Sequence, residues 1–321
     1  MINLALIGAG DHAEKCHTPA LSLFVEKNPD TISLAAVCDI DREKASNLGK
    51  KIGFQNIYGD IQQLLDNEKI DACLCIVPAK VLVKTAKLIL GHNIPAVVEK
   101  PLGLHVDESR ELLNFVQKTD TLHMVSANRR FVPLLNKAIA WCQKMGKIVY
   151  VKCLFARPNR TEPEFIWSTG VHAVDAMRYI AGDVVDFQIS PIYASDLSNK
   201  WGHIAFQFKE GMSGSLDILP TCGQNLERYE IYGEGFRSVI EIHDFFREVR
   251  LQCWHNKSLQ IDETMNDDNT PFSVRDGSFA EFTEFVEAIQ NKRQAKPMIQ
   301  DFIKSSEICH AIDQAISNKI E

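Results

Sequence analysis

The feature that most constrains the fold is a glycine-rich turn that follows directly on a short apolar run. Residues 8–13 read Gly-Ala-Gly-Asp-His-Ala and come immediately after the apolar residues 4–7. Between a strand and a helix, Gly8 allows a tight turn and Gly10 lets a pyrophosphate approach the backbone closely, while Ala13 is small enough for the helix to pack on the strand. The pattern therefore predicts a dinucleotide-binding turn.

The first 127 residues alternate between short β-branched runs and amphipathic helical stretches. The expected strands are residues 2–7, 33–38, 71–77, 96–99 and 122–127. The clearest helical patterns between them are residues 42–51, 81–90 and 107–117. Buried strands separated by helices are typical of a parallel sheet with helices on both faces. We therefore expect residues 1–127 to form an α/β Rossmann domain.

A different pattern begins after about residue 147, with alternating apolar and polar residues as in 204–208 and 229–232. This periodicity predicts a mostly antiparallel open sheet, so residues 128–321 are expected to form an α+β domain that binds substrate and mediates oligomerisation. A helix over 171–180 would cover one face of the sheet, and a second subunit of a homodimer or homotetramer the other. The Asp- and Asn-rich residues 256–275 are expected to form a surface loop.

Composition excludes several classes of function. The chain of 321 residues has 35 Lys and Arg against 42 Asp and Glu, a net charge of -7, and no basic block, which disfavours nucleic-acid binding. Without a signal-peptide pattern or an apolar run approaching ~18 residues, we expect a cytoplasmic protein that does not enter a membrane. The nine cysteines are expected to be reduced thiols. The ten histidines show no paired spacing of metal ligands, so no metal is expected.

A carboxylate at the end of the second expected strand bears on the choice of cofactor. The run Ala-Val-Cys at 36–38 leads into Asp39, where the adenosine ribose should lie, although the gap from the glycines exceeds the usual ~20 residues. A longer first helix and loop would account for the gap. Because a carboxylate accepts bonds from ribose hydroxyls and repels a 2′-phosphate, Asp39 favours NAD over NADP.

Further motifs give the chain a resemblance to a known family. Residues 99–101 read Glu-Lys-Pro, residues 128–131 read Asn-Arg-Arg-Phe, and residues 170–175 read Gly-Val-His-Ala-Val-Asp. Together with the glycine turn, their order and spacing resemble the glucose-fructose oxidoreductase / inositol dehydrogenase (Gfo/Idh/MocA) family over nearly the whole chain. The resemblance implies a small-molecule substrate whose hydroxyl is oxidised to a carbonyl, with hydride passing to a nicotinamide. It also implies that Lys100 and His172 lie beside that nicotinamide and exchange the hydroxyl proton.

The resemblance and the glycine turn together give a set of candidate residues. Those expected to bind cofactor are Gly8, Gly10, Asp11, His12, Ala13, Asp39, Val77, Pro78, Glu99 and Asn128. Those expected to bind substrate are Lys100, Arg129, Arg157, Trp167, Ser168, His172 and Asp175. Within this set, Arg157 or its neighbour Arg160 could grip an anionic group and Trp167 could stack on a sugar ring. Asp175 could orient His172 or belong to a local network.

Two departures from the family pattern leave alternatives open. Many sugar dehydrogenases of the family carry an aspartate four residues before the histidine, whereas this chain has Ser168, which is no base at neutral pH. The family's usual Thr-Pro-Pro after the fourth strand is here Val77-Pro78-Ala79. The leading hypothesis is an NAD-dependent dehydrogenase of a sugar, cyclitol or related polyol. The alternatives are a non-catalytic NAD-binding sensor and an NAD-dependent glycosidase.

Overall fold

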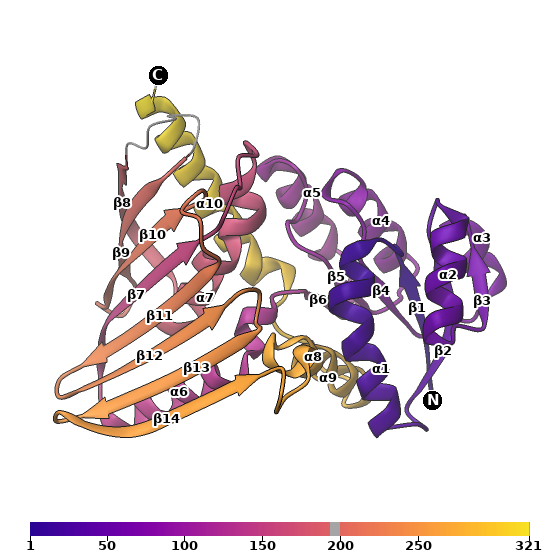
Figure 1. Cartoon of the computed structure of the whole chain (residues 1–321). Coiled ribbons are helices and arrows are strands. Elements are labelled where there is room, and N and C mark those ends of the chain that lie inside the picture. Colours follow the sequence, from indigo (N-terminus) through magenta and orange to yellow (C-terminus); the bar gives the residue numbers. More distant parts are fainter. Residues whose placement is uncertain (193–199, 321) are drawn as a thin grey trace. The chain divides into compact units, whose positions relative to one another are not determined.

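The computed structural model describes residues 1–192 and 200–320, and the chain divides into two compact units (Figure 1). The first unit contains Met1–Ala127 and Ser278–Lys304, and the second contains Asn128–Gly277 and Ser305–Glu321. Each unit is described by itself. In the described part of the chain, no helix is both long and apolar enough to cross a membrane.

The first unit is built on a six-stranded sheet in the order β3-β2-β1-β4-β5-β6, in which every pair of neighbours is parallel. Its strands are β1 (Ile2–Ile7), β2 (Ile32–Cys38), β3 (Asn56–Tyr58), β4 (Ala72–Cys75), β5 (Ala96–Val98) and β6 (His123–Val125). All residues of β4 and β5 are buried, as expected for parallel strands covered on both faces. This is the Rossmann domain that the sequence pattern predicts.

Helices connect these strands. They are a short π-helical turn, η1 (Ala13–His17), and the α-helices α1 (Thr18–Lys27), α2 (Arg42–Ile52), α3 (Ile61–Asn67), α4 (Ala79–Gly91) and α5 (Val106–Val116). The strand order reverses between β1 and β4, because the chain goes outward from β1 through β2 and β3 and then returns to β4. At such a switch point the loops leave a crevice beyond the carboxyl ends of the strands, where ligands bind.

Residues 278–304 belong to the first unit, although the sequence pattern assigned all of 128–321 to one domain. Within this segment lie α9 (Ser278–Gln290) and the start of α10 (Ile299–Ile320). The reason is apolar packing, since the ring of Phe24 on α1 lies 5.2 Å from Phe282 and 6.4 Å from Phe279, centroid to centroid. The backbone N–H of Val125 in β6 also donates to the carbonyl of Pro297 at 2.8 Å.

The second unit is built on an eight-stranded sheet in the order β14-β13-β12-β11-β7-β10-β9-β8. The strands are β7 (Ile148–Ala156), β8 (Val184–Pro191), β9 (Gly202–Phe208), β10 (Ser213–Leu219), β11 (Leu226–Gly233), β12 (Phe236–His243), β13 (Glu248–His255) and β14 (Ser258–Asn266). All neighbours are antiparallel except β7 and β10. The mostly antiparallel sheet predicted from the alternating pattern is therefore confirmed.

The helices of this unit lie along one face of the sheet (Figure 1). They include α6 (Pro133–Met145) and α7 (Val171–Ala181), with the short turns η2 (Asn128–Phe131) and η3 (Ile166–Gly170) before them and the second part of α10 at the end. Val151, Cys153 and Phe155 of β7 are fully buried. The other face of the sheet carries charged cross-strand pairs, such as His203 Nδ1 with Asp217 Oδ1 at 2.7 Å.

The expectation of a surface loop over residues 256–275 is wrong. Most of this segment is the edge strand β14 and the short helix α8 (Phe272–Arg275). The strand forms because its backbone pairs with β13, and none of its residues is fully buried, so apolar alternation is not required. The side chain of Arg275 is 1% exposed and its Nε donates to the carbonyl of Phe246 at 2.7 Å.

Candidate functional site

The glycine turn leaves β1 at its carboxyl end, beside the end of β4. Gly8 has φ +98°, and a Cβ there would lie 2.0 Å from the carbonyl oxygen of Ile76. A side chain at this position is therefore excluded by the backbone of the neighbouring strand. Val77 lies at the same place, since its Cγ1 would be 3.2 Å from that Cβ. The structure thus brings Gly8 and Val77 together, while Pro78 is exposed and caps the start of α4.

Gly10 differs from Gly8 because the protein's own packing does not require a glycine there. A Cβ built on Gly10 would meet no heavy atom within 4 Å. The space next to this backbone is open, as it must be if a pyrophosphate is to approach it. The residues present therefore fit a dinucleotide at this turn.

Asp39 joins the end of β2 to the glycine turn. Its Oδ2 accepts the backbone N–H of Ala9 at 2.7 Å, and its Oδ1 accepts that of Asp41 at 2.9 Å. Asp41 in turn caps α2, accepting from the backbone N–H groups of Glu43 and Lys44. The two bonds fix the carboxylate of Asp39 at the carboxyl edge of the sheet, where the resemblance expects a ribose.

A cluster of His12, His17 and Glu99 lies beside the same turn. The Nε2 atoms of His12 and His17 lie 2.9 and 3.0 Å from one oxygen of Glu99, Oε1. The side chains of His17 and Glu99 are 10% and 6% exposed, whereas that of His12 is 52% exposed. The three ligand atoms all lie within 4.8 Å of one another.

The electrostatics of this cluster are strongly coupled. The carboxylate of Glu99 raises the pKa of His12 to about 10. Burial lowers the pKa of His17 despite its bond to Glu99. Burial alone would raise the pKa of Glu99, but the charge of His12, the bonds from both imidazoles and the charge of Lys100 together lower it well below its usual range. The carboxylate is therefore held ionised at neutral pH.

Sequence spacing missed this cluster because of the π-helical turn. An α-helix rotates by about 100° per residue, so residues five apart point roughly 140° away from each other. The i→i+5 hydrogen bonding of the π-turn η1 changes this and lets His12 and His17 reach the same carboxylate. Glu99 comes from the end of β5, more than eighty residues away in sequence. The absence of paired histidine spacing in the sequence therefore did not indicate this cluster.

Lys100 follows this cluster at the carboxyl edge of the sheet. It comes two residues after the end of β5 and is partly exposed. Its positive charge lowers the pKa values of both Glu99 and His17, so it lies within electrostatic range of both. The first unit thus brings together the carboxyl ends of β1, β4 and β5.

Asn128 and Arg129 open the second unit and belong to a buried polar network. Asn128 Nδ2 donates to the carbonyl of Asp276 at 3.0 Å, and Arg129 Nη1 donates to Asn128 Oδ1 at 2.9 Å. Arg129 also binds Glu227 through Nε at 3.2 Å and Nη2 at 2.5 Å. These bonds favour a structural role for the motif over direct contact with a ligand.

Arg157 is part of the same network rather than of a surface loop. Its side chain is 1% exposed, Nη2 donates to Glu227 Oε1, and Nη1 donates to the carbonyl of Ala156 at 2.8 Å. Tyr229 OH donates to Glu227 Oε2 at 3.0 Å. Burial opposes ionisation of Glu227, but the two guanidinium charges outweigh it and lower its pKa to about 2. The expectation that Arg157 binds a substrate is corrected, because its guanidinium is buried and held by Glu227 inside the unit.

The residues before His172 form a second π-helical turn. In η3, Ser168 donates its backbone N–H to the carbonyl of Glu164 at 2.8 Å, and α7 begins at Val171. Trp167 stacks on His310, with ring centroids 5.3 Å apart. His172 is partly exposed. π-Helical turns are rare and occur frequently at functional sites.

The remaining polar candidates near α7 bind other parts of the protein. Asp175 is 2% exposed, accepts two bonds from Arg130 at 2.8 and 2.7 Å, and accepts a third from Ser305 at 2.8 Å. Of the two roles considered for Asp175, the structure therefore shows the local network. Arg160 binds Glu162 and donates to Thr169 Oγ1 at 2.9 Å.

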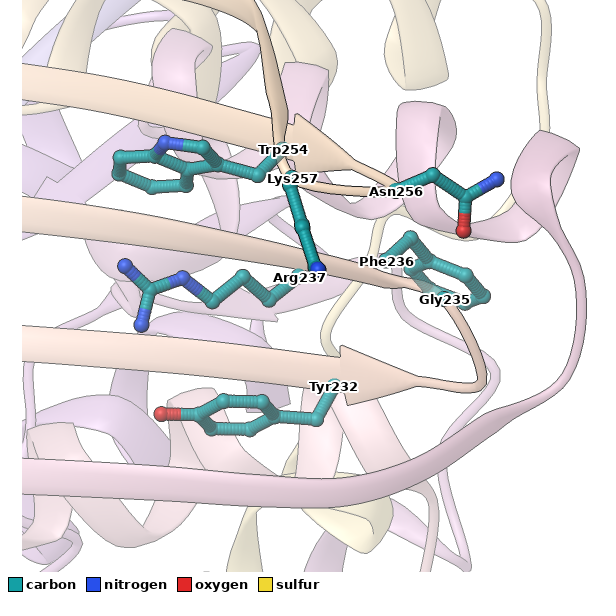
Figure 2. Close-up of a pocket in the computed structure, with 7 residues that line it drawn as sticks. All are labelled: Tyr232, Gly235, Phe236, Arg237, Trp254, Asn256 and Lys257. Atoms are coloured by element: carbon teal, nitrogen blue, oxygen red, sulfur yellow. The ribbon is translucent and has the colours of Figure 1, made fainter.

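A separate surface hollow of about 590 Å³ lies where β11, β12 and β13 turn (Figure 2). Figure 2 shows Arg237 and Trp254 side by side on neighbouring strands, with the guanidinium carbon 4.4 Å from the indole ring centre. The hollow is lined by Tyr232, Gly235, Phe236, Arg237, Trp254, Asn256 and Lys257. None of these is a candidate cofactor or substrate residue from the sequence, so the hollow is distinct from the predicted site.

Comparison with known proteins identifies a family that the Rossmann segment resembles. Residues 2–127 match the Gfo/Idh/MocA family model, described as an oxidoreductase family with an NAD-binding Rossmann fold. Over this segment the chain is similar to the Gfo/Idh/MocA family. The resemblance drawn from the motifs is confirmed.

Individual relatives extend the likeness beyond the Rossmann segment. Protein YMR315W of Saccharomyces cerevisiae is 22% identical over 316 residues, which cover 91% of this chain and 88% of that protein. D-apiose dehydrogenase of Rhizobium rhizogenes is 25% identical over 195 residues, which cover 56% of this chain and only 54% of the relative. A solved levoglucosan dehydrogenase in complex with NADH and levoglucosan has a TM-score of 0.83 at 16% identity, and the match covers 99% of this chain and 97% of that one. At that identity the structural likeness establishes the fold.

Proposed function

We propose that this oxidoreductase moves a hydride between NAD(H) and the carbinol carbon of a sugar, cyclitol or related polyol. The observation that carries the proposal is the arrangement at one edge of the parallel sheet. There a glycine turn with open space beside Gly10 lies near a carboxylate at Asp39 and a strand-end lysine at Lys100. The sugar dehydrogenases among the relatives support the substrate class.

We assign the two proton-exchanging roles to Lys100 and His172. Bound NAD would supply the hydride acceptor. The chain must then withdraw the hydroxyl proton as the hydride leaves, and return it in the reverse direction. The Nζ of Lys100 and the imidazole of His172 are the groups we expect to accept and release that proton. Ser168 would bind the substrate by hydrogen bonds without acting as a base, because a hydroxyl stays protonated at neutral pH.

The substrate set proposed from the structure is smaller than the sequence suggested. Arg129, Arg157 and Asp175 are held in buried networks, which supports positioning roles for them. Lys100, Ser168 and His172 remain as proposed contacts. A substrate without a negative charge fits this set, because no arginine is left to bind an anion among those proposed from the sequence.

The structure also supports NAD as the preferred cofactor. Asp39 is fixed by the N–H groups of Ala9 and Asp41, so its carboxylate cannot swing away from a neighbouring ligand without losing both bonds. A 2′-phosphate placed beside it would meet like charge. We therefore propose NAD rather than NADP.

Two further expectations are retained as proposals. The nine cysteines are free thiols, and seven of them are buried, which supports a reducing, cytoplasmic location. The helices of the second unit lie along only one face of its sheet, which supports a homodimer or homotetramer formed through the other face. Light scattering of the purified protein tests the oligomer, and a monomer at micromolar concentration would contradict it.

The proposed reaction is tested by NADH formation from NAD with a panel of neutral sugars and cyclitols. We expect the wild type to oxidise at least one member and Lys100→Ala to lose at least a hundredfold in kcat. Lys84→Ala, an exposed lysine on α4, is the matched control and should keep full activity. NADH binding is measured for each variant, so that lost chemistry is separated from lost cofactor.

Two outcomes would contradict the proposal. Equal turnover by Lys100→Ala would remove the lysine from the mechanism. A wild type that binds NADH but reduces no NAD with any panel member would refute the substrate class. Net NADH accumulation also separates a dehydrogenase from the glycosidase alternative, in which the cofactor returns to NAD within each turnover.

A further inference from the structure

The cluster of His12, His17 and Glu99 has the composition of a metal site. Two imidazoles and one carboxylate are a frequent donor set for zinc and for other divalent transition-metal ions. The three ligand atoms, Nε2 of each histidine and a carboxylate oxygen of Glu99, lie within 4.8 Å of one another. All three residues belong to the first unit.

The distances suit ligands of a single ion. With metal–ligand bonds of about 2.1 Å, two ligand atoms around the ion are about 3.4 Å apart in tetrahedral geometry and about 3.0 Å apart in octahedral geometry. Each imidazole Nε2 already lies 2.9 or 3.0 Å from Glu99 Oε1. Small side-chain rotations would therefore place the carboxylate oxygen and each imidazole around one ion.

Two residues of the cluster are buried and the third is exposed to solvent. His17 and Glu99 are almost fully buried at the end of the π-turn and of β5, so their positions are set by the packing of the unit. The side chain of His12 is 52% exposed, which leaves a path to solvent and room for water as further ligands. This combination is typical of an open metal site rather than a closed structural one.

Two charges oppose a cation here: the ammonium of Lys100, and the proton of His12, whose pKa is raised to about 10 and which must be displaced before the imidazole can bind a metal. Lys100 acts electrostatically on both His17 and Glu99, and its ammonium would repel a divalent ion. The site should therefore bind more weakly than a closed structural zinc site.

We propose that His12, His17 and Glu99 bind one divalent transition-metal ion, such as Zn²⁺, beside the glycine turn. Binding of the metal does not require the proposed reaction, although His12 and Glu99 are also among the residues expected to bind cofactor. Without metal, the same three groups form the hydrogen-bonded cluster described above. With metal, the ion takes the place of the imidazole N–H protons between the rings and the carboxylate.

The experiment titrates the full-length, chelator-treated protein with Co²⁺ and follows visible absorption, and it measures Zn²⁺ by calorimetry. We expect one ion per chain in the wild type. His12→Gln should weaken binding at least tenfold, because it removes a ligand. Because His12 is the exposed member, this variant should fold, which thermal melting verifies. His17→Gln is the second variant.

His203→Gln is the matched control. His203 lies on the sheet of the second unit and also faces a carboxylate, that of Asp217 at 2.7 Å, but among the described residues it belongs to no group of three side chains that could hold a metal ion. The variant His203→Gln should leave the affinity for the metal ion unchanged. Three results would overturn the proposal: no stoichiometric binding, equal affinity in His12→Gln, or binding lost equally in His203→Gln. The first would mean that there is no site, and either of the other two would mean an adventitious ion only.

Discussion

Replacing Glu227 by Gln should destabilise the protein through the buried network of the second unit. The carboxylate is 2% exposed and accepts bonds from Arg129, Arg157 and Tyr229. Gln preserves the size of the side chain but removes the negative charge. Two buried guanidinium groups are then left without their counter-ion, which is far more costly than loss of a surface pair.

The expected size follows from the pKa of Glu227. The network lowers it from 4.5 to about 2. Each unit of pKa corresponds to about 1.4 kcal/mol, so the ionised carboxylate contributes roughly 3 kcal/mol to the free energy of unfolding. Removing one partner of a buried pair costs a similar amount, about 3–5 kcal/mol. Because the folded-state pKa is the lower one, this contribution is complete above pH 4.5 and is lost as the pH falls towards 2.

The assay is urea unfolding of the wild type and of Glu227→Gln at pH 7 and at several acid pH values. The free energy of unfolding of Glu227→Gln should be lower than that of the wild type by roughly 3 kcal/mol at pH 7, and this difference should become smaller below pH 4.5. Glu263→Gln is the control, since Glu263 is 35% exposed and pairs with Lys137 at the surface. It should cost less than about 1 kcal/mol. The reasoning would be refuted if Glu227→Gln lowered the free energy of unfolding by less than about 1 kcal/mol. It would also be refuted if the difference from the wild type stayed constant down to low pH.

Three further variants test other parts of the structure. In Gly10→Ala the added Cβ meets no heavy atom within 4 Å, so the melting temperature should be unchanged. NADH binding should weaken at least tenfold, because the Cβ occupies the space that the pyrophosphate needs. Unchanged affinity in a fluorescence titration would argue against the turn as a cofactor site. Asp39→Ser should lower the preference for NADH over NADPH at least tenfold in the same titration, because it removes the charge facing a 2′-phosphate, and an unaltered preference would contradict that role. Asp175→Asn should lower the free energy of unfolding by about 3 kcal/mol, since it breaks the buried pair with Arg130, and a neutral effect in urea would show that the pair contributes little.

Much of the fold could be predicted because its signals are local. Buried parallel strands such as β1 and β4 appear in the sequence as uninterrupted apolar runs, and the glycine turn marks where β1 ends. Two strands were not predicted because their local sequence signal is weak. The strand β3 has only three residues, and β14 has only three apolar residues, Leu259, Ile261 and Met265, among six polar ones, so the apolar pattern on which prediction depends is weak in both. Both form because the backbone of a neighbouring strand supplies hydrogen bonds.

The candidate site was predictable only where its residues adjoin one another in sequence. Gly8 and Gly10 follow from the turn that they form, and Lys100 from the motif that contains it. The partner of Arg157 is Glu227, seventy residues further on, and nothing in the sequence around either residue indicates the pair. The grouping of His12 and His17 depends on a π-turn, for which apolar periodicity gives no signal.

The placement of residues 278–304 has a consequence for how the chain folds during synthesis. When the first 127 residues have emerged from the ribosome, they contain every strand of the parallel sheet, yet the segment that packs on Phe24 and pairs with Val125 is still about 150 residues away. An N-terminal domain usually folds as a unit as soon as it has been translated. Here the nascent Rossmann unit keeps an apolar surface around Phe24 uncovered until the whole sheet of the second unit has been made, which makes this stretch of synthesis the period in which a chaperone would be needed most.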